Sequence, residues 1–178
     1  MPFCARCTGI YIGVFFAFFF FLLKKRLQAG ETFSIPQAVL TALAILPVGV
    51  DGVGSYLGLW ESSQLMRILT GSLVGAIVPG FLLMAGNFDP KRENTGLIYK
   101  STAELLLLMG VSLAFGLCLW AGVPLHGLGA VVSVAGEVIL WSGVVWLLLK
   151  TLCKGKDFWR ISMLLSFVIL FAVGGLVS

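Results

Sequence analysis

The sequence predicts an all-α fold, a compact bundle of six transmembrane helices that forms one integral-membrane domain over residues 1–178. The first observation is composition, because 59% of the residues are hydrophobic and the mean hydropathy is +1.05. The second is that the apolar residues form unbroken runs of about the 20 residues that cross a hydrocarbon core. Membrane barrels instead alternate apolar and polar residues in strands of roughly ten. The third observation is a bias in the basic residues.

Six apolar runs define the expected spans, at 8–23, 35–50, 68–86, 102–123, 128–149 and 161–177. The first run is short and rich in phenylalanine, and we expect it to recruit part of the turn before it. Its basic residues follow the apolar run instead of preceding it, which is the reverse of a cleaved signal peptide. We therefore interpret it as a retained span.

The basic residues predict the orientation of the spans. Ten of the 12 Lys and Arg residues follow the first, third and fifth spans, and only Arg6 and Arg67 lie on the opposite side. Short cytoplasmic loops carry the excess of positive charge. The sequence therefore predicts a multi-pass protein of the plasma (inner) membrane with both termini extracytoplasmic and the lipid bilayer as its surroundings. The net charge of +4 is then a topology signal, and no nucleic-acid partner is expected.

Small residues predict where helices touch. Gly9 and Gly13 are four residues apart in the first span, as are Gly71 and Gly75 in the third. Lipid removes most of the hydrophobic drive between helices, so contacts depend on small residues that let backbones approach. We expect both faces to be helix contacts.

Polar residues gather on the predicted outer side in three segments, at 4–9, at 51–54 and at 61–71. On a helix, Arg67 and Thr70 share a face that Gln64 flanks. A guanidinium that faces lipid is costly, so this face should meet protein or water. A simpler interpretation is that Asp51 ends a helix and Arg67 extends to the headgroups. We expect a shared site with catalytic candidates Asp51, Glu61 and Arg67, and substrate-binding candidates Arg6, Gln64, Arg67 and Thr70.

Arginine in such a site binds carboxylate or phosphate through two hydrogen bonds, so an anionic lipid headgroup or lipid-linked substrate is the expected partner. Asp51 and Glu61 would act as acid–base groups or metal ligands. Cys4 and Cys7 have the spacing of a redox disulfide in an oxidising compartment. The same pair would supply half of a tetrahedral site for a transition metal such as zinc, with His126 as a candidate further ligand.

Glu137 lies near the middle of the fifth span, where a carboxylate is costly and commonly functional. It is a candidate proton relay or counter-ion for Arg67, and a protonated, hydrogen-bonded carboxyl group is the simpler interpretation. Three functions follow from these residues: a metal-assisted site acting on an anionic lipid, a small-molecule or ion transporter that uses Glu137, and a membrane thiol oxidoreductase. Whether the protein is an enzyme stays open.

The run 2–13, with its Cys-x-Arg-Cys-Thr-Gly motif, resembles a family of small prokaryotic membrane proteins catalogued as domain of unknown function 2085. Asp51-Gly52 and Arg67-x-x-Thr70-Gly71 extend the resemblance to about Gly75. The resemblance implies a Cys-His pair upstream of the motif, which this chain does not contain. The family's full set of Cys, His, Cys and Cys implies a metal or haem environment, and the family implies no known activity.

Overall fold

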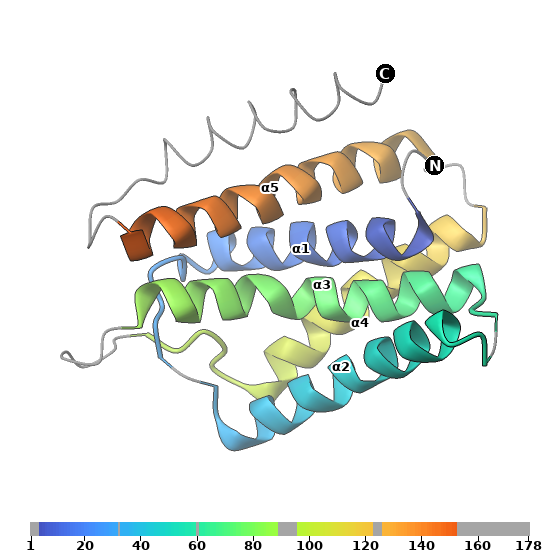
Figure 1. Cartoon of the computed structure of the whole chain (residues 1–178). Helices are drawn as coiled ribbons and strands as arrows, with labels where there is room; N and C mark the ends of the chain where they lie inside the picture. Colours follow the sequence, from blue (N-terminus) through green and yellow to red (C-terminus); the bar gives the residue numbers. More distant parts are fainter. Residues whose placement is uncertain (1–3, 32, 60, 89–95, 123–125, 153–178) are drawn as a thin grey trace.

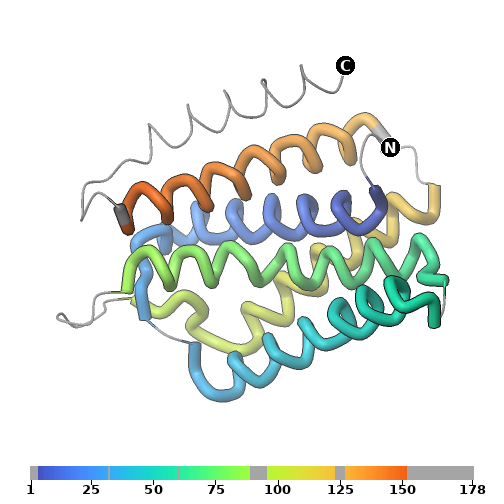
Figure 2. The backbone as a smooth tube through the Cα atoms, viewed as in Figure 1, coloured from blue at the N-terminus to red at the C-terminus, as the bar shows by residue number. Residues whose placement is uncertain are grey.

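The computed structural model describes residues 4–31, 33–59, 61–88, 96–122 and 126–152. These residues form five helices that alternate in direction along the bundle (Figures 1 and 2). Each helix is long and apolar enough to cross a membrane, which confirms the all-helical, multi-span prediction for this part of the chain. The sixth expected span, 161–177, lies outside the described residues. The helices are α1 (Ala5–Leu23), α2 (Ile35–Tyr56), α3 (Gln64–Asn87), α4 (Thr102–Trp120) and α5 (His126–Leu152).

Four helices, α1, α2, α3 and α5, extend beyond the expected apolar runs, while α4 ends at Trp120, before the expected residue 123. The N-cap of α1 is Cys4, whose sulfur accepts the amide of Cys7, and the N-cap of α3 is Ser63, whose hydroxyl accepts the amide of Met66. Such caps satisfy amides that a first turn leaves free, so the helix can begin among polar residues. The C-terminal end of α2 continues past the expected limit, residue 50, to Tyr56. Hydropathy alone therefore placed these boundaries too far inside the helices.

The central contact of the fold is between α1 and α3, with α5 beside α1 and α2 beside α3 (Figure 1). Gly9 and Gly13 lie against the α3 backbone, and Gly71 and Gly75 lie against the α1 backbone. A Cβ at any of these four positions would collide with main-chain atoms of the facing helix. The expected small-residue contacts are thus confirmed, and they join the first span to the third.

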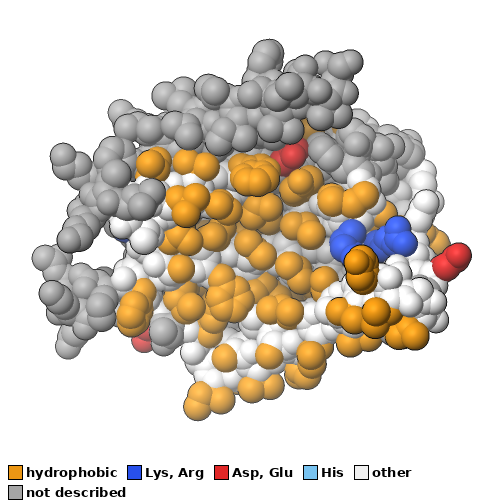
Figure 3. Space-filling model, viewed as in Figure 1, with side chains coloured by type: hydrophobic (Ala, Val, Ile, Leu, Met, Phe, Trp, Pro, Cys, Tyr) orange, Lys and Arg blue, Asp and Glu red, His pale blue; other side chains and the backbone are white. Residues whose placement is uncertain are grey.

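The face of the described bundle that Figure 3 shows is apolar along its middle. On α2 the exposed side chains include Val39, Leu43 and Leu46. Such a surface is suited to lipid, and the charged residues of the described helices, apart from Glu137 in the middle of α5, lie toward the helix ends. Because the helices alternate, one end gathers the start of α1 and α3 with the end of α2 (Figure 1). We call this the cysteine end, and the opposite end, which carries Lys24, Lys25, Arg26, Lys100 and Lys150, the basic end.

Candidate functional site

The two cysteines of the motif lie together at the first turn of α1. Their sulfur atoms are 2.6 Å apart, and the Cys4 sulfur also accepts the backbone N–H of Cys7 at 3.3 Å. Cys4 is exposed and Cys7 is half-buried. The Cys-x-x-Cys spacing brings this about because residues three apart on a helix lie on one face. The exposed sulfur is therefore the one that an incoming partner meets first.

The surroundings of Cys4 favour its thiolate. The adjacent Cys7 thiol, through its hydrogen bond, holds the pKa of Cys4 below the ordinary thiol value. Burial has the next largest effect and raises the pKa of Cys4, while weaker effects of the backbone amides of Cys7 and Arg6 and of the Arg6 charge lower it. A thiolate is the nucleophilic form of cysteine, so Cys4 is prepared for attack on a sulfur or for binding a cation.

Arg6 and Asp51 form an ion pair that joins α1 to α2. The Arg6 Nη2 donates to Asp51 Oδ2 at 2.5 Å, and the Asp51 side chain is 6% exposed. The guanidinium also lies over Gly52, where an added Cβ would be 3.7 Å from Nη1. The sequence suggested a substrate-binding role for Arg6 and a catalytic role for Asp51. The pair adds a structural role, because each charge offsets the cost of burying the other.

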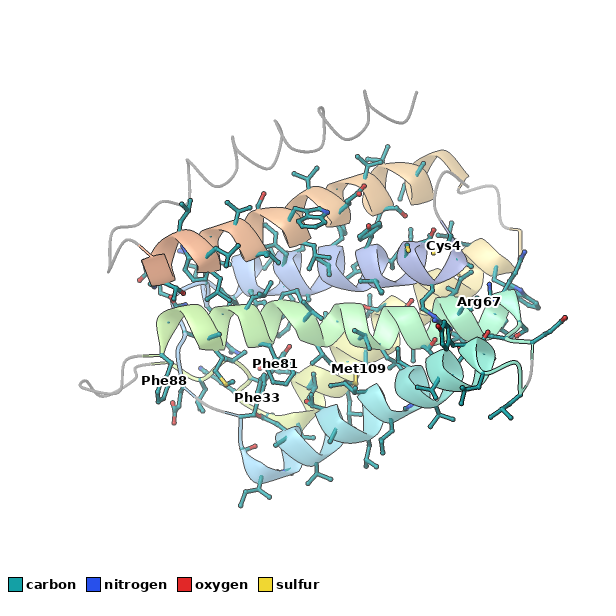
Figure 4. All side chains as sticks on the ribbon, in the orientation of Figure 1. Cys4, Phe33, Arg67, Phe81, Phe88 and Met109 are labelled. Carbon is teal, nitrogen blue, oxygen red and sulfur yellow. The ribbon has the colours of Figure 1, made fainter. Side chains whose placement is uncertain are left out.

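Arg67 is a basic residue of α3 at the same end of the bundle as Cys4 (Figure 4). The Nε atoms of Arg67 and of Arg6 are buried and have no hydrogen-bond partner among the described residues. The ion pairs within those residues join Arg6 to Asp51 and Arg26 to Glu104, and neither includes Arg67. Each of these two guanidinium groups therefore has a buried Nε donor that is not satisfied within the described residues, and only Arg6 has an ion pair there.

The remaining candidates on this side are dispersed. Thr70 is buried, and its hydroxyl donates to the backbone carbonyl of Met66 at 2.7 Å, so its proton is used within the helix. Gln64 is exposed in the first turn of α3, and Glu61 is exposed just before that turn. The structure thus brings Cys4, Cys7, Arg6 and Asp51 to one end with Arg67. The Thr70 hydroxyl instead donates its hydrogen bond within α3.

Glu137 contacts α1 from the middle of α5. Its Oε1 accepts a hydrogen bond of 3.5 Å from the hydroxyl of Tyr11, and Gly136 next to it lies against the Tyr11 backbone. Tyr11 is one helical turn beyond Cys7, on the same face of α1. Sequence reasoning did not select Tyr11, although a tyrosine at i+4 from a motif cysteine was an available signal.

The donor set at the cysteine end has two sulfurs. Among the described residues no group of three or more His, Cys, Asp or Glu side chains comes together as a metal site. His126 begins α5, and its side chain lies outside the described set. Two thiolates are half of the four ligands that zinc takes in structural sites. Within this part of the chain the geometry favours a dithiol over a complete metal site.

Residues 1–82 match the model of a family described as "Predicted membrane protein (DUF2085)". This match confirms the resemblance expected from the Cys-x-Arg-Cys-Thr-Gly motif. It covers α1, α2 and most of α3, the three helices that supply Cys4, Asp51 and Arg67. The chain is accordingly a multi-span membrane protein whose residues 1–82 are similar to a family of predicted membrane proteins of unknown function.

Two archaeal relatives support the same assignment. An uncharacterised protein of Methanocaldococcus jannaschii is 36% identical over 83 residues, which are 47% of this chain and 51% of the relative. An uncharacterised protein of Methanothermobacter thermautotrophicus is 35% identical over 75 residues, which are 42% of this chain and 62% of the relative. The similarity thus spans little more than half of each relative. No solved structure matches this chain.

Proposed function

We propose that this protein exchanges thiols and disulfides at the extracytoplasmic membrane surface, with Cys4 as the attacking cysteine and Cys7 as the resolving one. The observation that carries the proposal is the contact of 2.6 Å between the two sulfurs at the start of α1, with Cys4 exposed. The lowered pKa of Cys4 supports its role as the nucleophile. The positive-inside bias supports the oxidising side of the membrane as the location.

The exchange proceeds in two displacements. The Cys4 thiolate attacks one sulfur of a disulfide in a partner protein, forms a mixed disulfide and releases the partner's other sulfur as a thiolate. Cys7 then gives up its proton and attacks the Cys4 sulfur, which forms the Cys4–Cys7 disulfide and releases the second partner thiolate. The partner gains two electrons and this chain loses two, and the protons of Cys4 and Cys7 pass to the partner's sulfurs. A second partner dithiol reverses these steps and restores the reduced pair.

The metal-assisted alternative uses the same cysteines. It would need two further ligands, and the described residues near Cys4 and Cys7 do not supply them as a cluster. Arg6 also places a positive charge beside the thiols, which favours a thiolate without a metal. These features support dithiol exchange ahead of a zinc or haem site acting on lipid. Elemental mass spectrometry of the purified chain would reveal a bound metal directly.

A redox titration of the full chain in detergent tests the proposal. The protein is equilibrated in glutathione buffers of graded potential, trapped with acid and labelled with a maleimide that shifts its mass per free thiol. We expect Cys4 and Cys7 to oxidise together with one midpoint and two electrons. Cys118→Ser, which changes a cysteine in α4, should leave that midpoint unchanged.

The decisive variants are Cys4→Ser and Cys7→Ser. With Cys4→Ser the titration should lose its intramolecular disulfide, and exchange with a model protein disulfide should stop. With Cys7→Ser a mixed disulfide with the partner should accumulate, because the resolving thiol is missing. If Cys4 and Cys7 stay reduced across the glutathione range, or if Cys7→Ser traps no mixed disulfide, the proposal is wrong.

A second candidate function is ion or small-molecule transport, and the contact between Tyr11 and Glu137 favours it. These groups form a polar pair between α1 and α5 at a depth where polar pairs are rare and commonly functional. In proteoliposomes, proton-coupled flux that Glu137→Gln abolishes and Tyr11→Phe reduces would establish transport. Flux that is the same with Glu137→Gln would remove Glu137 from the mechanism.

A further inference from the structure

Arg67 is a charged group that the thiol exchange does not use. Its side chain is half-buried near the start of α3, and its buried Nε has no acceptor among the described residues. The ion pairs found in the described part of the chain do not include it. A partly desolvated guanidinium without an acceptor is unfavourable, so a protein keeps one where a ligand supplies the acceptor.

Arg6 brings a second guanidinium to this end of the bundle. The Arg6 backbone carbonyl lies against Gly71, which is one helical turn beyond Arg67 on α3. Both side chains therefore start from helices in backbone contact and at nearly the same level. Figure 3 shows adjoining blue side chains on one face at this end, with an acidic side chain farther out. Arg6 uses Nη2 for Asp51, and its buried Nε has no partner in the described set.

Unsatisfied donors at this place favour an anion. Arg6 and Asp51 form an ion pair, while no ion pair of the described residues includes Arg67, and the one further described carboxylate nearby in the sequence, Glu61, is exposed. Ser62, just before the N-cap of α3, adds a buried hydroxyl without a hydrogen-bond partner in the described residues. Two guanidinium groups and a hydroxyl are donors that fit the several oxygens of a phosphate group.

We propose that Arg67 and Arg6 bind a phosphate group at the cysteine end, next to the dithiol. This site goes beyond thiol exchange and needs no reaction of the cysteines. The phosphate can belong to a lipid headgroup or to a soluble phosphate compound. An apolar groove lined in part by Val50, Val53 and Gly54 lies on α2, the helix that carries Asp51, and is the expected place for the acyl chain of a lipid. The experiment therefore separates the two sources.

The test measures lipid binding to the full chain in phosphate-free detergent by native mass spectrometry. Phosphatidic acid is the probe, and diacylglycerol, which has the same chains without the phosphate, is the control ligand. We expect phosphatidic acid to bind and diacylglycerol not to, and Arg67→Gln to weaken binding about tenfold, as the loss of a charged hydrogen-bond pair does. Lys25→Gln, which removes an exposed charge at the basic end, should leave binding unchanged.

Inorganic phosphate at millimolar concentration identifies the source. If it displaces phosphatidic acid, the site takes soluble phosphate, and if it does not, the site selects lipid. Arg67→Lys keeps the charge but loses the planar pair of donors, so we expect a smaller loss of binding than with Arg67→Gln. If Arg67→Gln does not fold, Arg67→Lys alone tests the role of the Arg67 guanidinium. Equal affinity of the wild type and both Arg67 variants, or equal binding of diacylglycerol, would overturn the proposal.

Running the same assay with Cys4→Ser separates this site from the thiol chemistry. Binding that persists with Cys4→Ser would support the phosphate site even if the redox titration fails. If the wild type forms no Cys4–Cys7 disulfide in the redox titration, the thiol-exchange proposal is wrong, but the measured binding of phosphatidic acid still stands. The two proposals therefore fail by different measurements.

Discussion

At the basic end of the bundle the half-buried Arg26 binds an acidic partner, whereas at the cysteine end Arg6 has such a partner and the half-buried Arg67 has none among the described residues. Arg26 donates to both carboxylate oxygens of Glu104, at 2.7 and 3.2 Å, and to the carbonyl of Ile98 at 3.3 Å. The Lys100 amide also donates to Glu104, at 2.9 Å. Such a bidentate ion pair with further hydrogen bonds is a stabilising arrangement.

Asn87 extends this network at the basic end. Its side-chain nitrogen donates to the carbonyls of Leu27 and Ala29, at 2.9 and 3.2 Å, and its oxygen accepts from Lys150 at 3.0 Å. One side chain therefore joins the end of α3 to the connection after α1 and to α5. At the cysteine end, by contrast, the Nε atoms of Arg6 and Arg67 and the hydroxyl of Ser62 are buried without partners. Each end thus has an ion pair and a buried donor without a partner in the described residues, since the Tyr99 hydroxyl is unpartnered near the basic end. The difference lies in Arg67, whose guanidinium is in no ion pair of the described residues and is the proposed donor to a phosphate.

Of the variants Arg26→Gln, Lys25→Gln and Arg67→Gln, the largest expected loss of stability is that of Arg26→Gln, at the basic end. Arg26→Gln removes the partner of Glu104, whose side chain is 22% exposed, while that of Arg26 is 13% exposed. We expect a loss of about 2 kcal/mol in the free energy of unfolding, below the roughly 3–5 kcal/mol of a fully buried pair because water reaches these groups. Unfolding of the purified protein in graded dodecyl sulfate measures it.

Lys25→Gln is the matched control for Arg26→Gln, because it removes an exposed charge one residue away. We expect its free energy of unfolding to stay within about 0.5 kcal/mol of the wild type. If Arg26→Gln is equally mild, the ion pair does not stabilise this end, and the contrast between the ends loses its main support.

The next effect concerns the reactivity of Cys4. Its pKa lies below the ordinary thiol value, so at any pH below that value more of it is thiolate, and alkylation should reach half its maximal rate at a lower pH. Cys7→Ala removes the largest cause, the hydrogen bond from the Cys7 thiol. We therefore expect the rate profile of Cys4 to move to higher pH.

The measurement uses a membrane-impermeant maleimide, with Cys118 and Cys153 replaced by serine. Serial pH steps give the alkylation rate of Cys4 with and without Cys7→Ala. An unchanged profile would mean that the Cys7 thiol does not set the reactivity of Cys4. Labelling from the cytoplasmic side of oriented vesicles would contradict the orientation predicted from the basic loops.

Much of the fold could be predicted because the membrane imposes it. Apolar runs long enough to span a bilayer gave the five helices seen here, and the glycines at 9, 13, 71 and 75 gave their closest contact. The helix ends were harder, because caps such as Cys4 and Ser63 continue a helix into polar sequence. A hydropathy value describes how apolar a residue is, so it does not predict that a side chain will cap a helix by accepting a hydrogen bond from a backbone amide.

The candidate site could be predicted only in part. Spacing alone brought Cys4 and Cys7 together, because they share a helix. The pairing of Arg6 with Asp51 joins residues that are 45 positions apart, and that of Tyr11 with Glu137 joins residues 126 apart. Such contacts depend on which helices are neighbours, and the sequence predicted small-residue faces without saying which faces meet.

The smallest expected effect on stability is that of Arg67→Gln. Arg67 has no ion pair in the described part of the chain, so the substitution removes a partly desolvated charge and leaves no carboxylate unpaired. We expect the free energy of unfolding to stay within about 0.5 kcal/mol of the wild type or to rise, as it commonly does when a functional charge is removed. The same dodecyl sulfate titration measures it in phosphate-free detergent.

Adding phosphatidic acid sharpens the contrast. A ligand that binds the folded state raises its apparent stability, so the wild type should gain stability with phosphatidic acid and Arg67→Gln should gain less. Arg26→Gln should start lower and still gain as much as the wild type, because it leaves the cysteine end intact. If Arg67→Gln costs as much stability as Arg26→Gln without lipid, then Arg67 is a structural residue, and the two ends of the bundle do not differ in the way their contacts indicate.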